Sequence, residues 1–313
     1  MTKTTTNKNK CITPDEIHGV WAVALLPWDE QWQLDEVSFR ANLDHVLASE
    51  PEGLYTLDTA SEFYTLEFAD WRHVAEMFVG HSRKRGATLP LGLGCTWTNQ
   101  AGALERIRVA RDLGVQTIHL SAPYWAPLDV EGLRRFYAAA QEQAEHLGIV
   151  IYAPSWTSID LDVALYRMLR NDAPNIIGTK TGDKHPDLYA TEGSHFTGED
   201  TLIEMMKLGA QGVYSAIGGI SIRFVQDWIK LIREDKWEAA DEIDGRMKKF
   251  YAQAVVPCCD AGVTNGAIDK AMAQVGGAIG SRAMRPPYTS MSDALYRDFD
   301  AAARKYLPEA FVN

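Results

Sequence analysis

The sequence predicts an α/β protein, a closed (β/α)8 TIM barrel with a C-terminal helical extension. Apolar runs of strand length alternate with segments of helical periodicity from Gly19 onward, which is typical of a parallel α/β fold. Eight such repeats in about 215 residues fit one closed barrel. No Gly-rich dinucleotide or phosphate-binding motif follows a strand, so the usual sequence signature of an open nucleotide-binding sheet is missing.

The eight strands are predicted from short apolar runs bounded by turn residues. Strands buried on both faces give continuous apolar runs, because helices cover the outside of a parallel sheet. The predicted strands are residues 20–26, 53–57, 89–95, 117–121, 149–153, 175–180, 194–197 and 212–216.

Helices are predicted where apolar residues recur on one helical face. Those between the strands cover residues 35–49, 67–83, 101–113, 130–147, 161–169, 200–208 and 222–232. After Arg233 only helices follow, over 236–256, 266–275 and 292–306, separated by glycines and prolines. The expected organisation is therefore a disordered tail (1–11), a barrel (12–233) and a helical extension (234–313).

Composition excludes several functional classes. The net charge of -11 argues against a general nucleic-acid or anionic-membrane binder, and no apolar stretch reaches the length of a membrane span. The first ten residues contain no apolar core of a secretory signal. The four cysteines lack metal-ligand spacing, so we expect a reduced, cytoplasmic protein without a metal or other cofactor.

Lys180 is the candidate nucleophile. It ends the predicted strand 175–180, and catalytic groups of such barrels lie at the carboxyl ends of strands. An amine there attacks a ketone to form a Schiff base. The pKa of its ammonium would have to fall from about 10.4 toward neutrality, which burial beside Ile176 and Ile177 favours. The alternative is a lysine whose ammonium reaches solvent.

Tyr152 ends the preceding strand, so a barrel makes it the lateral neighbour of Lys180. Its phenol is a candidate proton shuttle for imine formation and carbon-carbon cleavage. The alternative is an ordinary core tyrosine. His119 and His195 lie within strands without a carboxylate at fixed spacing, so both are predicted to be structural and a catalytic metal is not expected.

Loops beyond the strand ends supply candidate binding groups. Residues 58–62 (Asp-Thr-Ala-Ser-Glu) follow the second strand and combine hydroxyls with small residues, a suitable cradle for a carboxylate; the alternative is a local turn or helix cap. Aromatic side chains follow other strands, among them Trp97, Trp125 and Trp156. They indicate an apolar or aromatic substrate, although each alone is also compatible with ordinary packing.

With these residues in register, the chain resembles the dihydrodipicolinate synthase and N-acetylneuraminate lyase superfamily over about residues 12 to 290. Residues 58–62 take the place of the Gly-Thr-Thr-Gly-Glu loop that binds the pyruvate carboxylate in that superfamily. Tyr152-Ala153-Pro154 resembles its Tyr-Asn-x-Pro segment, Gly178-Thr179-Lys180 its Gly-x-Lys strand, and residues 209–212 its Gly-Ala-x-Gly turn.

Departures from this pattern indicate a branch. A dihydrodipicolinate synthase has a second tyrosine in its Pro-Tyr-Tyr motif and an arginine for a second carboxylate, where this chain has Trp125 and Trp156. In this respect, and in Thr264-Asn265-Gly266, it is similar to trans-o-hydroxybenzylidenepyruvate hydratase-aldolases. That resemblance implies Lys180 as Schiff-base lysine and Tyr152 as acid/base. It also implies a carboxylate held by Thr59 and the backbone of Ala60 and Ser61, and a distal group contacted by Trp125, Trp156 and Asn265.

The leading hypothesis is a cofactor-free, Schiff-base lyase that cleaves an aromatic benzylidenepyruvate-type 2-keto acid to an aldehyde and pyruvate. A second hypothesis is an aldolase or dehydratase for a 2-keto-3-deoxy sugar acid, against which the tryptophans count because such a substrate needs polar loops. A third is a barrel that binds a keto acid without turnover. The resemblance also implies a homotetramer.

Overall fold

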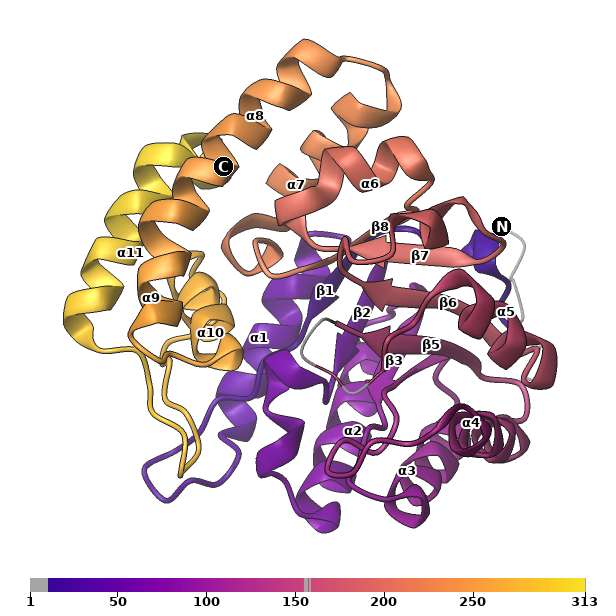
Figure 1. Ribbon diagram of the computed structural model, residues 1–313. Coiled ribbons are helices and arrows are strands. Elements are labelled where there is room, and N and C mark those ends of the chain that lie inside the picture. Colours follow the sequence, from indigo (N-terminus) through magenta and orange to yellow (C-terminus); the bar gives the residue numbers. More distant parts are fainter. Residues whose placement is uncertain (1–10, 155–156, 158, 313) are drawn as a thin grey trace.

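Eight parallel strands close into a barrel in the order β1 to β8, with β8 pairing back onto β1 (Figure 1). The structure is a computed structural model and describes residues 11–154, 157 and 159–312. The predicted (β/α)8 fold is confirmed. The strands are β1 (Gly19–Val23), β2 (Gly53–Thr56), β3 (Leu91–Gly94), β4 (Thr117–Leu120), β5 (Gly148–Ala153), β6 (Ile176–Thr181), β7 (Ser194–Thr197) and β8 (Gly212–Ser215).

One helix follows each of the first five strands, and further helices follow β7 and β8, whereas β6 is followed by a short 3-10 helix, η4 (Pro186–Ala190). The helices begin where the sequence provides caps; the Asp129 and Asp162 side chains, for example, accept from Gly132 and Leu165. They are α1 (Glu36–Ala48), α2 (Phe68–Lys84), α3 (Gln100–Leu113), α4 (Val130–Ala144), α5 (Val163–Asp172), α6 (Leu202–Leu208) and α7 (Gly218–Arg233).

The core has two parts. Between strands and helices lies an aliphatic layer that includes Leu43, Val74 and Ile107. Inside the barrel the packing is more aromatic, because Trp21, Tyr55, Phe196 and Tyr214 point to the axis and contact one another edge to face or at a tilt. These rings fill the interior of the barrel.

The pairing of β5 with β6 sets the position of Lys180. Ile149 pairs with Ile176 but Val150 pairs with Gly178, and this register shift brings Lys180 opposite Tyr152. A Cβ at Gly178 would lie 1.8 Å from the Ser194 carbonyl oxygen of β7. The close approach of β6 to β7 therefore requires glycine two residues before Lys180.

The C-terminal helices gather on one side of the barrel, in orange to yellow in Figure 1. They comprise α8 (Trp237–Phe250), a π-helical turn η6 (Tyr251–Val255), α9 (Val256–Asp260), α10 (Asn265–Val275) and α11 (Asp293–Tyr306). The single helix predicted over 236–256 is interrupted by the π turn, which widens the helix at Tyr251. Helix α10 packs on α7 and on η2 (Thr59–Ser61), the turn after β2.

Residues 1–10 of the predicted tail lie outside the described residues. Among those described, none of the helices is both long and apolar enough to cross a bilayer.

Candidate active site

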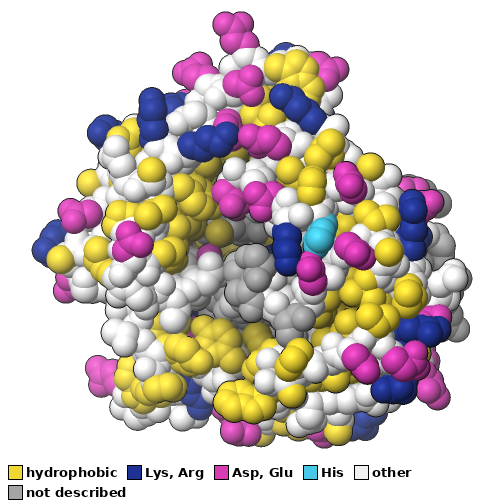
Figure 2. Space-filling view, viewed as in Figure 1, with side chains coloured by type: hydrophobic (Ala, Val, Ile, Leu, Met, Phe, Trp, Pro, Cys, Tyr) yellow, Lys and Arg dark blue, Asp and Glu magenta, His cyan; other side chains and the backbone are white. Residues whose placement is uncertain are grey.

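A cavity of about 400 Å³ opens at the carboxyl ends of the strands, visible as a hollow in Figure 2. Lys180 and Tyr152 line it together with Ala60 and Asn265, so four of the predicted site residues meet there. Its other walls carry tyrosines and carboxylates from β2, β7, β8 and the C-terminal helices. These include Tyr55, Glu199, Tyr214, Tyr251 and Asp269.

Lys180 points into this cavity rather than into bulk water, because its side chain is only 19% exposed. Three tyrosine rings surround the ammonium, with centroids 4.6 Å (Tyr152), 5.1 Å (Tyr214) and 5.2 Å (Tyr55) from Nζ. Cation-π contacts of this kind hold an ammonium in place where water is scarce. The geometry fits the predicted nucleophile and not a lysine that extends to solvent.

Tyr152 pairs directly with Lys180 across β5 and β6, so the predicted adjacency is confirmed. Burial, followed by the Asp58 carboxylate, raises the pKa of its phenol, while a hydrogen bond with Thr59 opposes the rise. The phenol therefore holds its proton at neutral pH. Tyr152 is placed to donate a proton first and to recover it later.

The surroundings of Lys180 differ from the apolar setting predicted. The carboxylate oxygen Oδ2 of Asp58 lies 3.6 Å from Lys180 Nζ and 3.4 Å from His119 Nδ1. The side chains of Asp58 and His119 are both buried. His119 therefore has a buried carboxylate neighbour that spacing along the sequence did not indicate. Sequence spacing missed the pair because β2 and β4 are separated by β3 in the barrel and meet only across its interior.

The charges of this buried group are coupled. Burial raises the pKa of Asp58, but the Lys180 ammonium and His119 outweigh it and hold that pKa at about 2. Burial lowers the pKa of His119, so the imidazole is neutral. His195, in contrast, is a structural residue as predicted, because both ring nitrogens bond to threonine hydroxyls, at 2.9 Å (Thr179) and 3.0 Å (Thr191).

The predicted carboxylate cradle contains the 3-10 turn η2. Some of its backbone N–H donors are already used in hydrogen bonds within the turn. The N–H groups of Thr59 and Ser61 donate to Oδ1 and to the carbonyl oxygen of Asp58. The Ser61 hydroxyl donates to the Ala24 carbonyl oxygen, away from the cavity. Ser61 therefore does not offer the backbone donor expected from the sequence, whereas Ala60 lines the cavity and the Thr59 hydroxyl bonds to Tyr152.

Of the two predicted tryptophans, only Trp125 is among the described residues, and it does not line the cavity with Lys180. Trp125 lies in the loop between β4 and α4, is 86% exposed, and is not among the described residues that line the cavity. The loop projects from the barrel rim, so an aromatic side chain just beyond a strand end need not face the site. Trp156 lies outside the described residues.

The C-terminal extension contributes a pair of side chains to the cavity. Asn265 begins α10, and its amide donates to Oδ2 of Asp269 at 3.0 Å. Burial raises the pKa of Asp269 to about 7, although the Lys180 ammonium opposes the rise. Asp269 was not identified from the sequence, but its spacing four residues after Asn265, on the same helical face, was a usable signal.

Glu199 is a second carboxyl group that sequence reasoning missed. It follows β7 and accepts hydrogen bonds from the Ser215 hydroxyl and, at 3.0 Å, from the Ile217 N–H. Burial raises its pKa to about 6. Its place just beyond a strand end was again the signal. The site thus combines one amine with a phenol and three buried carboxyl groups, a set suited to repeated proton transfer around an imine.

The chain is similar to known proteins over most of its length. Residues 16–306 match the Dihydrodipicolinate synthetase family. The 4-hydroxy-tetrahydrodipicolinate synthase of Porphyromonas gingivalis is 26% identical over 287 residues, covering 89% of this chain and 94% of the relative. That of Ehrlichia canis is 28% identical over 223 residues, covering 68% and 73%.

Solved structures share the fold. The 4-hydroxy-tetrahydrodipicolinate synthase of Methylacidiphilum fumariolicum has a TM-score of 0.82 at 20% identity, covering 94% of this chain and 98% of the other. YagE, a prophage protein of the dihydrodipicolinic acid synthase family from E. coli K12 in complex with pyruvate, has a TM-score of 0.81 at 20% identity, covering 93% and 99%. N-acetylneuraminate lyase from Fusobacterium nucleatum has a TM-score of 0.80 at 16% identity, also covering 93% and 99%.

Proposed function

The chain belongs to the dihydrodipicolinate synthetase family and is a pyruvate-dependent lyase, and we propose that it acts through a Schiff base on Lys180. The observation that carries the proposal is the position of the ammonium, which is enclosed by three tyrosine rings at the end of β6 and opens onto a cavity large enough for a small acid. An enclosed amine beside a proton donor is the arrangement that imine chemistry needs.

In this proposal Lys180 condenses with the C2 ketone of a 2-keto acid, and the protonated imine accepts the electrons of the bond that breaks. Tyr152 gives a proton to the carbinolamine oxygen and takes it back in the reverse step. The carboxylate of the substrate lies at Ala60 and the Thr59 hydroxyl, close to Tyr152. Cleavage releases an aldehyde and leaves an enamine of pyruvate, which is protonated and hydrolysed.

For the distal part of the substrate, the sequence resemblance favours an aromatic group and a hydratase-aldolase reaction on a benzylidenepyruvate-type acid. Support comes from Asn265, which lies in the cavity wall.

A hydroxyl-rich sugar acid is the second candidate, because the cavity wall on the side of β6 to β8 is polar. Thr157, Thr181, Thr197 and Ser215 line it. At the rim Asp160 pairs with Lys184 at 2.9 Å and with His185. Such a wall offers hydrogen bonds to the hydroxyl groups of a substrate.

Borohydride reduction in the presence of pyruvate tests the Schiff base. Wild-type protein should gain a reduced adduct, which peptide mass spectrometry locates on Lys180. The Lys180→Ala variant should gain none, while Lys248→Ala, which removes a half-exposed ammonium of α8, should behave as wild type. An adduct on any other lysine, or no adduct with any 2-keto acid, would refute the proposal.

Turnover of a substrate panel then separates the two candidate functions. Benzylidenepyruvates and 2-keto-3-deoxy sugar acids are compared at equal concentration for released pyruvate. Preference for the first class supports the hydratase-aldolase assignment, and preference for the second supports the sugar-acid assignment. Adduct formation with pyruvate but no turnover of either class would favour a barrel that binds keto acids.

A further inference from the structure

Asp58 is a fully buried carboxylate whose two oxygens have different surroundings. Oδ1 accepts the N–H of Thr59 at 3.0 Å and so caps the turn η2. Oδ2 lies 3.6 Å from Lys180 Nζ and 3.4 Å from His119 Nδ1, and it accepts no ordinary hydrogen bond from the described residues. One carboxylate oxygen is therefore committed to the fold, and the other faces the reactive nitrogen.

The position of Asp58 is a departure from the family pattern. In the resemblance described above, residues 58–62 replace Gly-Thr-Thr-Gly-Glu, so this carboxylate stands where that loop begins with glycine. A cap for η2 does not require a carboxylate, because an asparagine side chain accepts the same N–H. Burying a negative charge has a large free-energy cost unless a partner offsets it, and the partner here is the ammonium itself.

We propose that Asp58 is a further catalytic residue, the base that accepts the proton which Lys180 must lose before it attacks a keto acid. This inference rests on the proposed Schiff-base function. Burial of the amine disfavours its charged form but provides no group to accept the proton, and the carboxylate of Asp58 is that acceptor. The imidazole of His119 is the other neighbour of Oδ2, with Nδ1 at 3.4 Å.

The N–H bond of the ammonium breaks, its proton moves to Oδ2, and the electron pair remains on nitrogen. Nitrogen then bonds to C2, and the π electrons of the ketone move to its oxygen. A second N–H proton passes to this oxygen through Tyr152, and the proton held by Asp58 follows. The C–O bond breaks with release of water, and the ionised carboxylate faces the iminium cation.

Rates of adduct formation with pyruvate, trapped by borohydride, test the assignment in the full-length protein. Asp58→Asn keeps the cap and the size of the side chain but is not a base, so trapping at neutral pH should slow by about 100-fold or more. The defect should shrink at alkaline pH, where hydroxide can remove the ammonium proton. Asp241→Asn, an exposed position on α8, is the control.

The Asp58→Gly variant provides a second test that does not depend on the folding of Asp58→Asn. Glycine is the residue of the family loop, and it leaves space for a small acid beside Nζ. Added formate should restore trapping in this variant and leave wild type unchanged, a result that a purely structural role does not produce.

Two outcomes would overturn the assignment: Asp58→Asn trapping at the wild-type rate and pH profile, or Asp58→Gly doing so without formate. If wild type forms no adduct with any 2-keto acid, the proposed function itself fails.

Discussion

At the scale of single residues, the site places three buried carboxyl groups near one amine, and their different environments give them different pKa values. Asp58 stands beside the ammonium, and its pKa is held at about 2. Burial instead raises the pKa of Glu199 to about 6 and that of Asp269 to about 7. At neutral pH, with Lys180 protonated, the site therefore contains one ionised carboxylate and two carboxyl groups whose pKa values lie near neutrality, a set that suits a reaction with several proton transfers.

Asp269 should make the stability of the protein depend on pH. Its folded pKa of about 7 lies above the ordinary 3.8, so the folded state keeps a proton that the unfolded state has lost. Its contribution is therefore present at low pH and lost as pH rises from about 4 to about 7, by about 1.4 kcal/mol for each pH unit. Asp269→Asn should flatten this fall in urea unfolding free energy.

Glu199, whose pKa is also raised, contributes to the pH dependence of stability in the same direction in wild type and in Asp269→Asn. The measurement therefore compares the shapes of the two pH profiles rather than the absolute unfolding free energies. Parallel profiles for wild type and Asp269→Asn would show that the pKa of Asp269 is not raised in the folded protein above its unfolded value.

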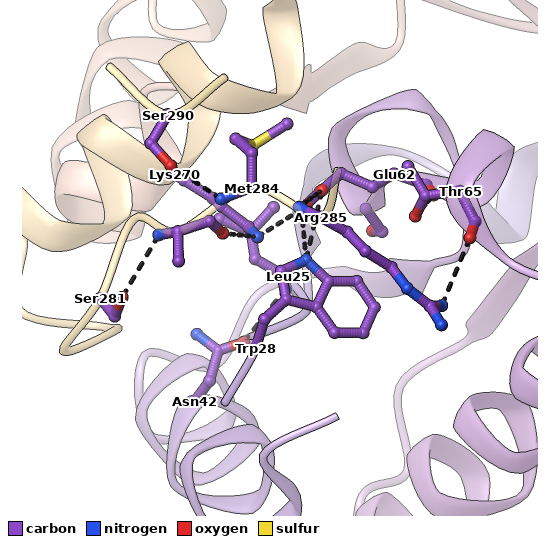
Figure 3. Close-up of polar contacts among 12 residues, drawn as sticks. Leu25, Trp28, Asn42, Glu62, Thr65, Lys270, Ser281, Met284, Arg285 and Ser290 are labelled. Atoms are coloured by element: carbon purple, nitrogen blue, oxygen red, sulfur yellow. Dashed lines mark hydrogen bonds and ion pairs between the residues drawn. The ribbon is translucent and has the colours of Figure 1, made fainter. Parts of the chain in front are cut away.

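At the scale of elements, the C-terminal extension is tied to the loop after β2 by a buried ion pair (Figure 3). Lys270 of α10 contacts Glu62, and both side chains are fully buried. Glu62 also accepts the Trp28 indole N–H at 3.1 Å and the Arg285 backbone N–H at 3.0 Å. Glu62 directly follows η2, so these contacts connect the extension to the turn that carries Thr59 and Ala60.

Breaking this pair should destabilise the protein strongly. Lys270→Met leaves Glu62 buried without its cation, and the unfolding free energy should fall by about 3 to 5 kcal/mol. The double variant Lys270→Met with Glu62→Gln should recover most of the loss, because glutamine still accepts from Trp28 and Arg285. Urea unfolding measures both.

Lys236→Met is the matched control, since it removes an exposed partner of Glu234 and should cost less than about 1 kcal/mol. The same small loss in Lys270→Met would mean that the buried pair contributes little to stability.

At the scale of the whole molecule, the barrel and the extension share one site. The predicted boundary at residue 233 remains a prediction about domains, but Asn265 and Asp269 come from beyond it and line the same cavity as Lys180. The other open question at this scale is assembly. Tyr124, Trp125 and Val130 lie close in sequence around the β4–α4 loop and are exposed, Trp125 by 86%. If these side chains form one contiguous apolar patch, that patch is a candidate contact with another protein surface.

We expect the chain to form a homotetramer and this loop to lie in one of its interfaces. Sedimentation should then give a mass four times the 34.8 kDa of one chain. Trp125→Arg should shift the mass to a smaller species because it places a charge in an apolar contact, whereas Val37→Arg, on an exposed part of α1, should not. A wild-type mass of one chain would contradict the expectation.

The sequence alone was enough to predict the barrel, because each apolar run between turn residues must be buried as a strand and each amphipathic segment must cover it. It also determined that Lys180 and Tyr152 stand together, since consecutive parallel strands are neighbours and both residues lie at carboxyl ends. The surroundings of the amine, in contrast, depend on the three-dimensional fold. Asp58 follows β2, His119 lies in β4 and Asp269 in α10, and their distances depend on closure of the barrel and docking of the extension rather than on spacing in the chain. The same reason explains why Trp125 does not line the cavity, since a position just beyond a strand end does not determine the direction of the loop.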